Sequence, residues 1–296
     1  MPHWSVDLAL SAMDSAGIAT AVTSVSAPGV VSLSRSRAAE VARECNDYAA
    51  EMAARHPGRF GYFALLPMQD LDASCKEARA SREAGAAGVC LLSNYEGRYL
   101  GEPCYEPLYG ELNRLGSIVF VHPTAPLTRV DVSGMSLSSL EFPFDTTRTC
   151  ASHILAQVGS RYPRIRWIMS HAGGAAPYLA GRLDRVLRDR PVVRDHMQGG
   201  VSGEMKSFYF DTALSTSAAA MNALKALVSV NHILFGSDFP YGPSGQMSYT
   251  SESLDALDWS DDEEQRLHHR NARRLLEGLP SAAPFASGAA EGGVRA

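Results

Sequence analysis

The sequence has few of the features that mark secreted, membrane-spanning or disulfide-stabilised proteins. It has five cysteines in 296 residues, an odd number with no C-x-x-C pair. That pattern argues against a disulfide framework or a zinc-thiolate site and favours a reducing cytosol. No segment approaches the ~18 apolar residues that a membrane span needs. The amino terminus also lacks the basic region and apolar stretch of a signal peptide. These absences predict a cytoplasmic protein that does not bind membranes.

An excess of positive charge is also absent. The chain has 27 Lys and Arg residues against 32 Asp and Glu residues, for a formal net charge of -5. Proteins that bind nucleic acid concentrate Lys and Arg on one face, so no nucleic-acid partner is expected. What is present is a 45% hydrophobic and 20% charged composition, which is typical of a soluble globular protein with a large core.

Strand-like and helix-like segments alternate along the chain. The predicted strands are 18–25, 60–66, 87–92, 118–122, 165–171, 207–211 and 233–238. The predicted helices are 6–16, 36–55, 71–84, 105–115, 146–161, 176–188, 215–228 and 261–277. Such regular alternation predicts a parallel sheet covered by helices.

The length suits one α/β barrel of the (β/α)8 TIM-barrel type. Only seven strands are predicted, however, and the segment before the strand at 18–25 has a helical pattern. We therefore expect a TIM-barrel type fold whose first strand is missing, which leaves the sheet with open edges. A single domain is expected over 1–279. The last residues, 280–296, are mostly Ala, Gly, Ser and Pro and predict a disordered tail.

Three of the apolar strand segments lead to a residue type that binds metals. His122 follows 118–121, His171 follows 165–170, and Asp238 follows 233–237. The carboxyl ends of parallel strands meet at one edge of a barrel, where catalytic residues gather. Each residue alone could be structural, as a loop-bonded histidine or a capping aspartate. Together on three strands they predict two imidazoles and a carboxylate around one metal ion.

Other chemistries have weaker support in the sequence. There is no G-x-S-x-G nucleophile elbow, and the two glycines after His171 are not followed by a phosphate-loop pattern. The remaining histidines lie in turns, in helices or at the start of a strand, and we assign them to structure or solvent: His3, His56, His153, His196, His232, His268 and His269.

Several motifs are shared with one enzyme family. They are 17–22, 94–101 (Asn-Tyr-Glu-Gly-Arg-Tyr-Leu-Gly), 119–124, 141–148 (Glu-Phe-Pro-Phe-Asp-Thr-Thr-Arg), 170–174 and 236–240. From residue 4 to residue 276 the chain resembles the metal-dependent decarboxylase branch of the amidohydrolase superfamily. That branch includes the aminocarboxymuconate-semialdehyde, methylsalicylate and resorcylate decarboxylases, and methylsalicylate decarboxylase looks nearest.

The resemblance implies roles for individual residues. His122 matches a metal ligand, Asp238 a metal ligand and proton carrier, and His171 the histidine that orients a metal-bound water or the substrate. His171 could also close in as a third ligand. Tyr241 matches an aromatic wall of the pocket. The substrate-binding candidates are Asn94 and Arg148, with Arg98 as a second arginine that could face a carboxylate.

The implied reaction is non-oxidative decarboxylation of a hydroxylated aromatic, salicylate-like acid or a related unsaturated carboxylic acid. The implied cofactor is a divalent metal, zinc first and manganese second, and the implied assembly is a homodimer. Hydrolysis of a lactone or amide, with His171 or Asp238 as the base, is the alternative that the same residues allow.

One departure from the family pattern affects these expectations. The family's first strand carries a His-x-His or Glu-x-His pair that supplies two metal ligands, and the only histidine upstream here is His3. The resemblance therefore implies weaker metal binding than in a relative that has the pair. An amino-terminally truncated, inactive form is the third alternative.

Overall fold

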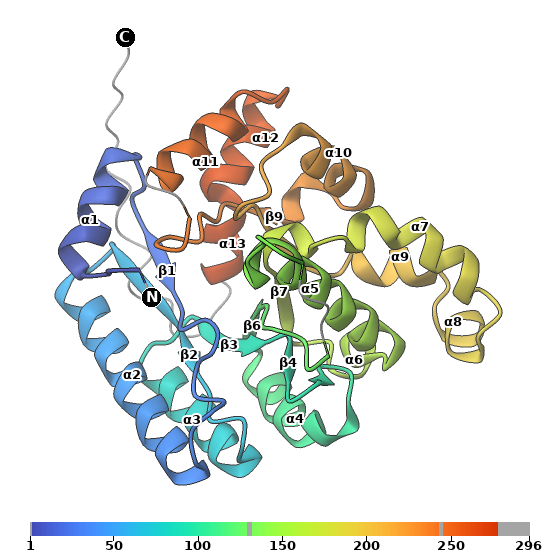
Figure 1. Ribbon diagram of the computed structural model, residues 1–296, viewed down its shortest axis with the longest axis horizontal. Helices are drawn as coiled ribbons and strands as arrows, with labels where there is room; N and C mark the ends of the chain where they lie inside the picture. Colours follow the sequence, from blue (N-terminus) through green and yellow to red (C-terminus); the bar gives the residue numbers. More distant parts are fainter. Residues whose placement is uncertain (1, 129–131, 243–244, 278–296) are drawn as a thin grey trace.

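The computed structural model describes residues 2–128, 132–242 and 245–277. Within them, seven strands form one curled sheet in the order β1-β2-β3-β6-β7-β8-β9, and every pairing in it is parallel (Figure 1). The strands are β1 (Ala21–Thr23), β2 (Phe60–Leu65), β3 (Gly88–Leu92), β6 (Ile118–His122), β7 (Arg166–Met169), β8 (Tyr209–Asp211) and β9 (Ile233–Leu234). The prediction of a parallel α/β fold with seven core strands is confirmed.

Helices surround the sheet on its outer side and, in the case of α13, cover one end of it. They are α1 (Val6–Ser15), α2 (Arg35–Arg55), α3 (Leu71–Glu83), α4 (Glu106–Leu115), α5 (Leu137–Leu155), α6 (Val158–Arg161), α7 (Ala176–Leu187), α8 (Pro191–His196), α9 (Gly200–Met205), α10 (Ala218–Leu227), α11 (Gln246–Asp255), α12 (Asp261–Gln265) and α13 (Asn271–Glu277). None of the helices described has the length and apolar character to cross a bilayer.

The strand and helix boundaries differ from the prediction in several places. The helix expected at 146–161 begins nine residues earlier, at Leu137, and Pro143 inside it masked its first half. It ends before Gln157, whose left-handed backbone (φ 55°) separates α5 from α6. The last strand is shorter than expected because the chain leaves the sheet after Leu234.

Some elements were not predicted at all. The antiparallel hairpin of β4 (Asn94–Tyr95) and β5 (Arg98–Tyr99) is too short to show a periodic pattern. The helices α8, α9 and α11 were also missed. The predicted tail at 280–296 lies outside the described residues, and the domain boundary at 279 stays a prediction.

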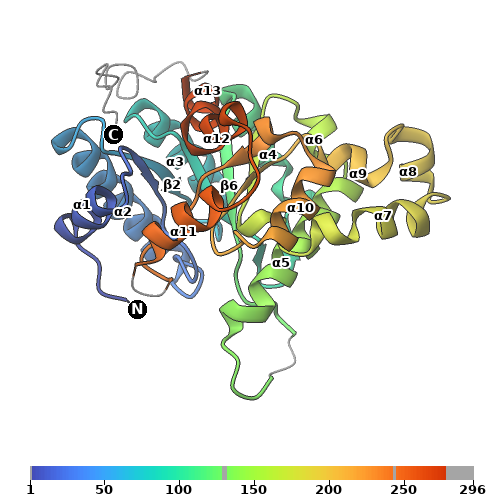
Figure 2. The same ribbon diagram turned by 90° about the horizontal axis from the view of Figure 1, so that it is seen from above.

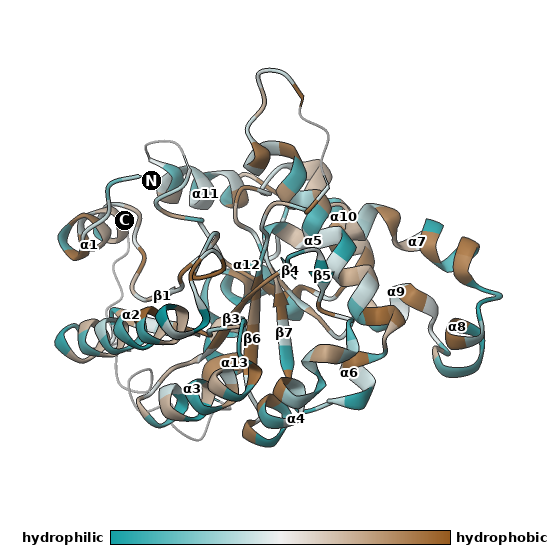
Figure 3. Cartoon of the chain, turned by 60° about the horizontal axis from the view of Figure 1, so that its bottom comes forward, coloured by the Kyte–Doolittle hydropathy of each residue, from teal (hydrophilic) through white to brown (hydrophobic). Residues whose placement is uncertain are grey.

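Alternation along each strand divides its side chains between two cores. Val119, Val121 and Trp167 face the helices and join the large outer core. Phe120 and Ile168 face the inside of the curled sheet and join a smaller inner core. Figure 3 shows β6 and much of β7 in the brown of hydrophobic residues. Since side chains alternate along a strand, His122 lies on the same inner face as Phe120.

The helix α13 covers the amino-terminal ends of the strands. Leu275 and Leu276 belong to the inner core, and the Leu275 carbonyl accepts a hydrogen bond of 3.0 Å from Arg166 at the start of β7. The opposite, carboxyl edge carries the long connections. Between β6 and α5, residues 123–128 and 132–136 project from the body (Figure 2), and Leu127 there is 75% exposed. The edge left uncovered by α13 is the one at which His122 lies.

Candidate metal centre

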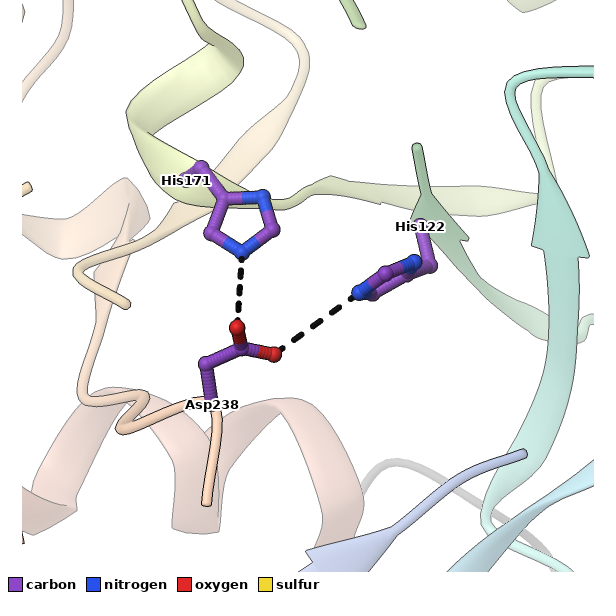
Figure 4. A group of neighbouring side chains, drawn as sticks. All are labelled: His122, His171 and Asp238. Atoms are coloured by element: carbon purple, nitrogen blue, oxygen red, sulfur yellow. Dashed lines mark ion pairs between the residues drawn. The ribbon is translucent and has the colours of Figure 1, made fainter. Parts of the chain in front are cut away.

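Three connections at the carboxyl edge bring His122, His171 and Asp238 together (Figure 4). His122 is the last residue of β6, His171 begins a short 3-10 turn after β7, and Asp238 lies in the loop after β9. The Nε2 atoms of His122 and His171 lie 3.7 Å and 3.6 Å from the two carboxylate oxygens of Asp238. One nitrogen or oxygen from each residue lies within 4.8 Å of the other two. The structure thus brings the three predicted ligands together, and their role as ligands stays a prediction.

Backbone conformation at the strand ends aims two of these side chains inward. His171 and Asp238 have φ values of 53° and 57°, in the left-handed region that non-glycine residues rarely adopt. Such strain persists where surrounding contacts hold it, and it concentrates at functional sites. After His171, a Cβ on Gly174 would lie 2.0 Å from the Pro143 carbonyl oxygen. Glycine there lets α5 approach the turn closely.

The electrostatics of the group favour a bound cation. Burial opposes ionisation of Asp238, but the His122 and His171 imidazoles offset it and hold its pKa at about 2. Burial also lowers the pKa of His171, but Asp238 and Asp211 outweigh it and raise the pKa above its usual value. A carboxylate that stays ionised and two imidazoles share a small, largely buried space.

The donor set fits a divalent metal. His122 Nδ1 lies 2.8 Å from the Pro123 carbonyl oxygen, which can only accept, so Nδ1 is the donor and Nε2 is the nitrogen that faces the other two residues. The separations of 3.6 Å and 3.7 Å are too long for hydrogen bonds. They are close to the ~3.4 Å between two ligands that each lie ~2.1 Å from a tetrahedral zinc ion. Two imidazoles and one carboxylate suit zinc and also manganese.

The predicted substrate-binding residues Asn94 and Arg148 lie around a buried carboxylate, that of Asp145. Asp145 is fully buried and accepts hydrogen bonds of 2.7 Å from Asn94 Nδ2 and from Tyr99 Oη, and another from Ser93 Oγ. Arg148 Nη1 lies 3.7 Å from the same carboxylate. The sequence prediction did not select Asp145, although the 141–148 motif contains it.

The Asp145 cluster also supports the end of β6. Ser93 Oγ accepts a hydrogen bond of 3.0 Å from the Thr124 amide, and the Ser93 amide donates to the His122 carbonyl at 2.9 Å. The cluster therefore adjoins the strand end that carries His122.

The other two aromatic or basic candidates lie in different places. The Tyr241 amide donates to the Asp238 carbonyl at 2.8 Å, which closes a turn that begins at Asp238, and Tyr241 is 46% exposed. Arg98 lines a cavity of about 460 Å³ together with Arg35 and Asp70. His122, His171 and Asp238 are not among the residues that line that cavity.

Two further residues at the site were not predicted. Phe142 of α5 packs edge-on against His122, with ring centroids 6.3 Å apart. Asp211 ends β8 and accepts a hydrogen bond of 2.7 Å from the His171 amide, and burial raises its pKa. The sequence did contain a pattern that could have identified Asp211, because this residue ends a strand in the same way as His122.

Comparison with known proteins places this geometry in a family. The model of the family described as "Amidohydrolase" matches residues 3–278. The chain belongs to the amidohydrolase family. The resemblance inferred from the motifs is confirmed.

Curated members of the amidohydrolase family that are similar to the chain include decarboxylases. The decarboxylase yanB of Aspergillus niger is 36% identical over 261 residues, which is 82% of this chain and 70% of the relative. The 6-methylsalicylic acid decarboxylase of Penicillium expansum is 30% identical, over 94% of this chain and 88% of the relative.

Solved structures share the fold. A 2,6-dihydroxybenzoate decarboxylase complexed with 2,6-dihydroxybenzoate is 25% identical, with a TM-score of 0.80 over 93% of this chain and 88% of that one. A 5-carboxyvanillate decarboxylase of Novosphingobium aromaticivorans, complexed with manganese and 4-hydroxy-3-methoxy-5-nitrobenzoic acid, is 24% identical. Its TM-score is 0.82 over 90% of this chain and 79% of that one.

Proposed function

We propose that this chain is a carboxy-lyase that removes carbon dioxide, without oxidation, from a hydroxylated aromatic, salicylate-like acid. The observation that carries the proposal is the convergence of His122, His171 and Asp238 at the carboxyl edge of the sheet. Relatives that cover most of the chain at 30% identity or more are decarboxylases by name, which supports the same reaction class.

A divalent metal would be held by His122, Asp238 and His171. We propose zinc, with manganese as the second candidate because a structural neighbour is complexed with it. When bound, such an ion polarises the substrate's carboxylate and the adjacent hydroxyl oxygen.

The chain's own residues orient the substrate and supply a proton. When the bond between the ring and the carboxylate breaks, its electron pair stays on the ring carbon and carbon dioxide leaves. His171, or Asp238 after it has taken up the proton of the substrate's hydroxyl group, then delivers a proton to that carbon, as positioned acids do. Phe142 packs edge-on against His122 and places an aromatic ring beside this position, and Tyr241 lies in the turn after Asp238. Burial of the two histidines limits access of water to the group.

A panel of acids tests the proposal. The purified chain is supplied with Zn²⁺ or Mn²⁺ and with 6-methylsalicylate or 2,6-dihydroxybenzoate, and carbon dioxide and the phenolic product are measured. We expect metal-dependent turnover of at least one acid, because both contain a carboxylate beside a hydroxyl group. Absence of turnover across the panel, combined with hydrolysis of an aryl lactone or amide, would instead support the hydrolase alternative.

The assembly and location of the chain are separate predictions. We propose a homodimer, which sedimentation equilibrium of the purified chain tests. A cytoplasmic location stays a prediction from composition, and fractionation of the source cells tests it.

A further inference from the structure

The strand β8 lies between the two strands whose ends carry His171 and Asp238. It supplies no member of the three-residue metal group. Its carboxyl end, Asp211 and Thr212, nevertheless forms hydrogen bonds to both neighbours. We call these two residues the β8 clamp.

Toward β7, the clamp holds the backbone of His171. Asp211 Oδ1 accepts hydrogen bonds from the His171 amide at 2.7 Å and from the Ala213 amide at 3.0 Å. His171 has a left-handed backbone, which costs free energy unless contacts fix it. Its ring nitrogen Nδ1 is buried and has no hydrogen-bond partner among the described residues. The orientation of this histidine therefore depends strongly on its backbone, whose amide donates to Asp211 and whose carbonyl accepts from the Gly174 amide.

Toward β9, the clamp holds the segment that leads to Asp238. The Thr212 amide donates to the Leu234 carbonyl at 3.1 Å. Thr212 Oγ1 donates to the Gly236 carbonyl at 3.2 Å and accepts from the Gly236 amide at 3.1 Å. This reciprocal pair lies two residues before Asp238, where the chain has already left the sheet. It takes the place of the strand-to-strand hydrogen bonds that would continue if β9 extended beyond Leu234.

Close packing joins the two halves of the clamp. A Cβ added to Gly236 would lie 3.0 Å from Asp211 Cβ and 3.1 Å from Asp211 Cγ. Thr212 is fully buried and Asp211 is buried. A shift of one strand end would therefore be transmitted to the other.

We propose that Asp211 and Thr212 are positioning residues that set the separation of His171 Nε2 from the Asp238 carboxylate, and thereby the metal affinity. The inference rests on the proposed metal-dependent function. Residues that orient metal ligands typically change metal affinity by roughly 10- to 100-fold when they are removed.

Four variants of the full chain separate the effect of the hydrogen bonds from the effect of side-chain size. Asp211→Asn keeps an oxygen that can accept from the His171 amide, whereas Asp211→Ala does not. Thr212→Ser keeps the hydroxyl, whereas Thr212→Val keeps the shape and removes both hydrogen bonds to Gly236. Mn²⁺ is titrated into each metal-free protein, and free Mn²⁺ is measured by electron paramagnetic resonance.

We expect Asp211→Ala and Thr212→Val to weaken Mn²⁺ binding by roughly 10- to 100-fold, and the two conservative variants to bind nearly as the parent does. Hydrogen exchange of the metal-free proteins should be faster at the His171 amide in Asp211→Ala and at the Gly236 amide in Thr212→Val. If Asp211→Ala does not fold, the comparison of Thr212→Val with Thr212→Ser is decisive.

Two results would overturn the inference and can be told apart. Unchanged Mn²⁺ affinity in the folded Ala and Val variants would remove the positioning role and leave the proposed function intact. A parent protein that binds neither Mn²⁺ nor Zn²⁺ would overturn the proposed function, and the clamp's role in metal binding with it.

Discussion

Two buried histidines show how differently one residue type behaves in two regions of this molecule. His171 is 8% exposed and His153 is 1% exposed. Asp238 and Asp211 raise the pKa of His171 although burial opposes the rise. Burial alone lowers the pKa of His153 to about 3. The two histidines are therefore shifted in opposite directions.

The difference lies in what surrounds each ring. His153 of α5 packs edge-on against Trp167 and Phe208, with ring centroids 4.5 Å and 5.1 Å away. His171 lies in the turn after β7 at the carboxyl edge of the sheet, beside two carboxylates. Burial is common to a core residue and a site residue, so burial alone does not indicate function. A buried imidazole that lies close to a charged side chain is a better indicator of a functional site.

The largest loss of activity should come from removing the carboxylate of Asp238, which lies beside His171 and has no counterpart beside His153 among the contacts described above. Asp238→Asn keeps the size of the side chain but loses the charge and the proton-carrying oxygen. We expect kcat/KM for a panel acid to fall by about 10³-fold or more, with an unchanged circular dichroism spectrum. An Asp238→Asn variant within tenfold of the parent would contradict the assignment of this residue.

The same substitution at both histidines tests the comparison directly. His171→Gln should lower kcat by about 10²-fold because a residue that touches the reacting group is lost. His153→Gln should leave kcat per folded molecule unchanged and lower the free energy of unfolding by about 1–3 kcal/mol, since it disturbs aromatic packing. Steady-state kinetics and urea unfolding measure the two effects. Equal loss of activity in both variants would contradict the division into site and core.

The pKa of His153 predicts a pH dependence of stability. The unfolded chain takes up a proton on this histidine near pH 6.5, whereas the folded chain does so only at about pH 3. The unfolded state therefore binds more protons as the pH falls from 6.5 toward 3, and the folded state loses stability. The loss at pH 5 is about 2 kcal/mol.

The variant His153→Phe isolates this contribution because it keeps an aromatic ring and cannot titrate. Urea unfolding at pH 7 and pH 5 should show a smaller loss of stability for the variant than for the parent. Identical losses would mean that His153 is not buried in its neutral form.

The smallest expected loss of activity comes from Phe142, near the start of α5. Phe142 contacts His122 at the site, whereas His153 lies in the core eleven residues later. An aromatic contact contributes about 0.5–1.5 kcal/mol, so Phe142→Leu should lower kcat/KM for an aromatic acid by roughly two- to tenfold. Its stability should keep the parent's dependence on pH. If Phe142→Leu changed the pH dependence of stability and left kcat/KM unchanged, Phe142 would belong to the core and not to the site.

The sequence predicted the parts of the fold that have a strong local pattern. Continuous apolar runs such as the one before His122 indicated the strands of the parallel sheet. The first half of α5 was hidden because Pro143 is normally found outside helix interiors. The hairpin of β4 and β5 was missed because two residues per strand form no period.

At the site, the sequence predicted residues that end apolar strands and missed those defined by long-range partners. His122, His171 and Asp238 follow from position alone. Asp145 receives its hydrogen bonds from residues about fifty positions earlier. Asp211 does end a predicted strand, but its hydrogen bond from the His171 amide, forty positions earlier, cannot be read from the sequence. No local pattern encodes such pairings, and a buried carboxylate is recognised only when the fold brings its donors together.

The central claim is that a metal ion held by His122, His171 and Asp238 supports decarboxylation. One titration tests it directly: Mn²⁺ is added to the metal-free chain in the presence of 6-methylsalicylate while carbon dioxide release is recorded. We predict a rate that rises from near zero and saturates at one ion per chain, with no such rise for Asp238→Asn. A rate that is independent of added Mn²⁺ and of a chelator, or that rises equally in Asp238→Asn, would contradict it.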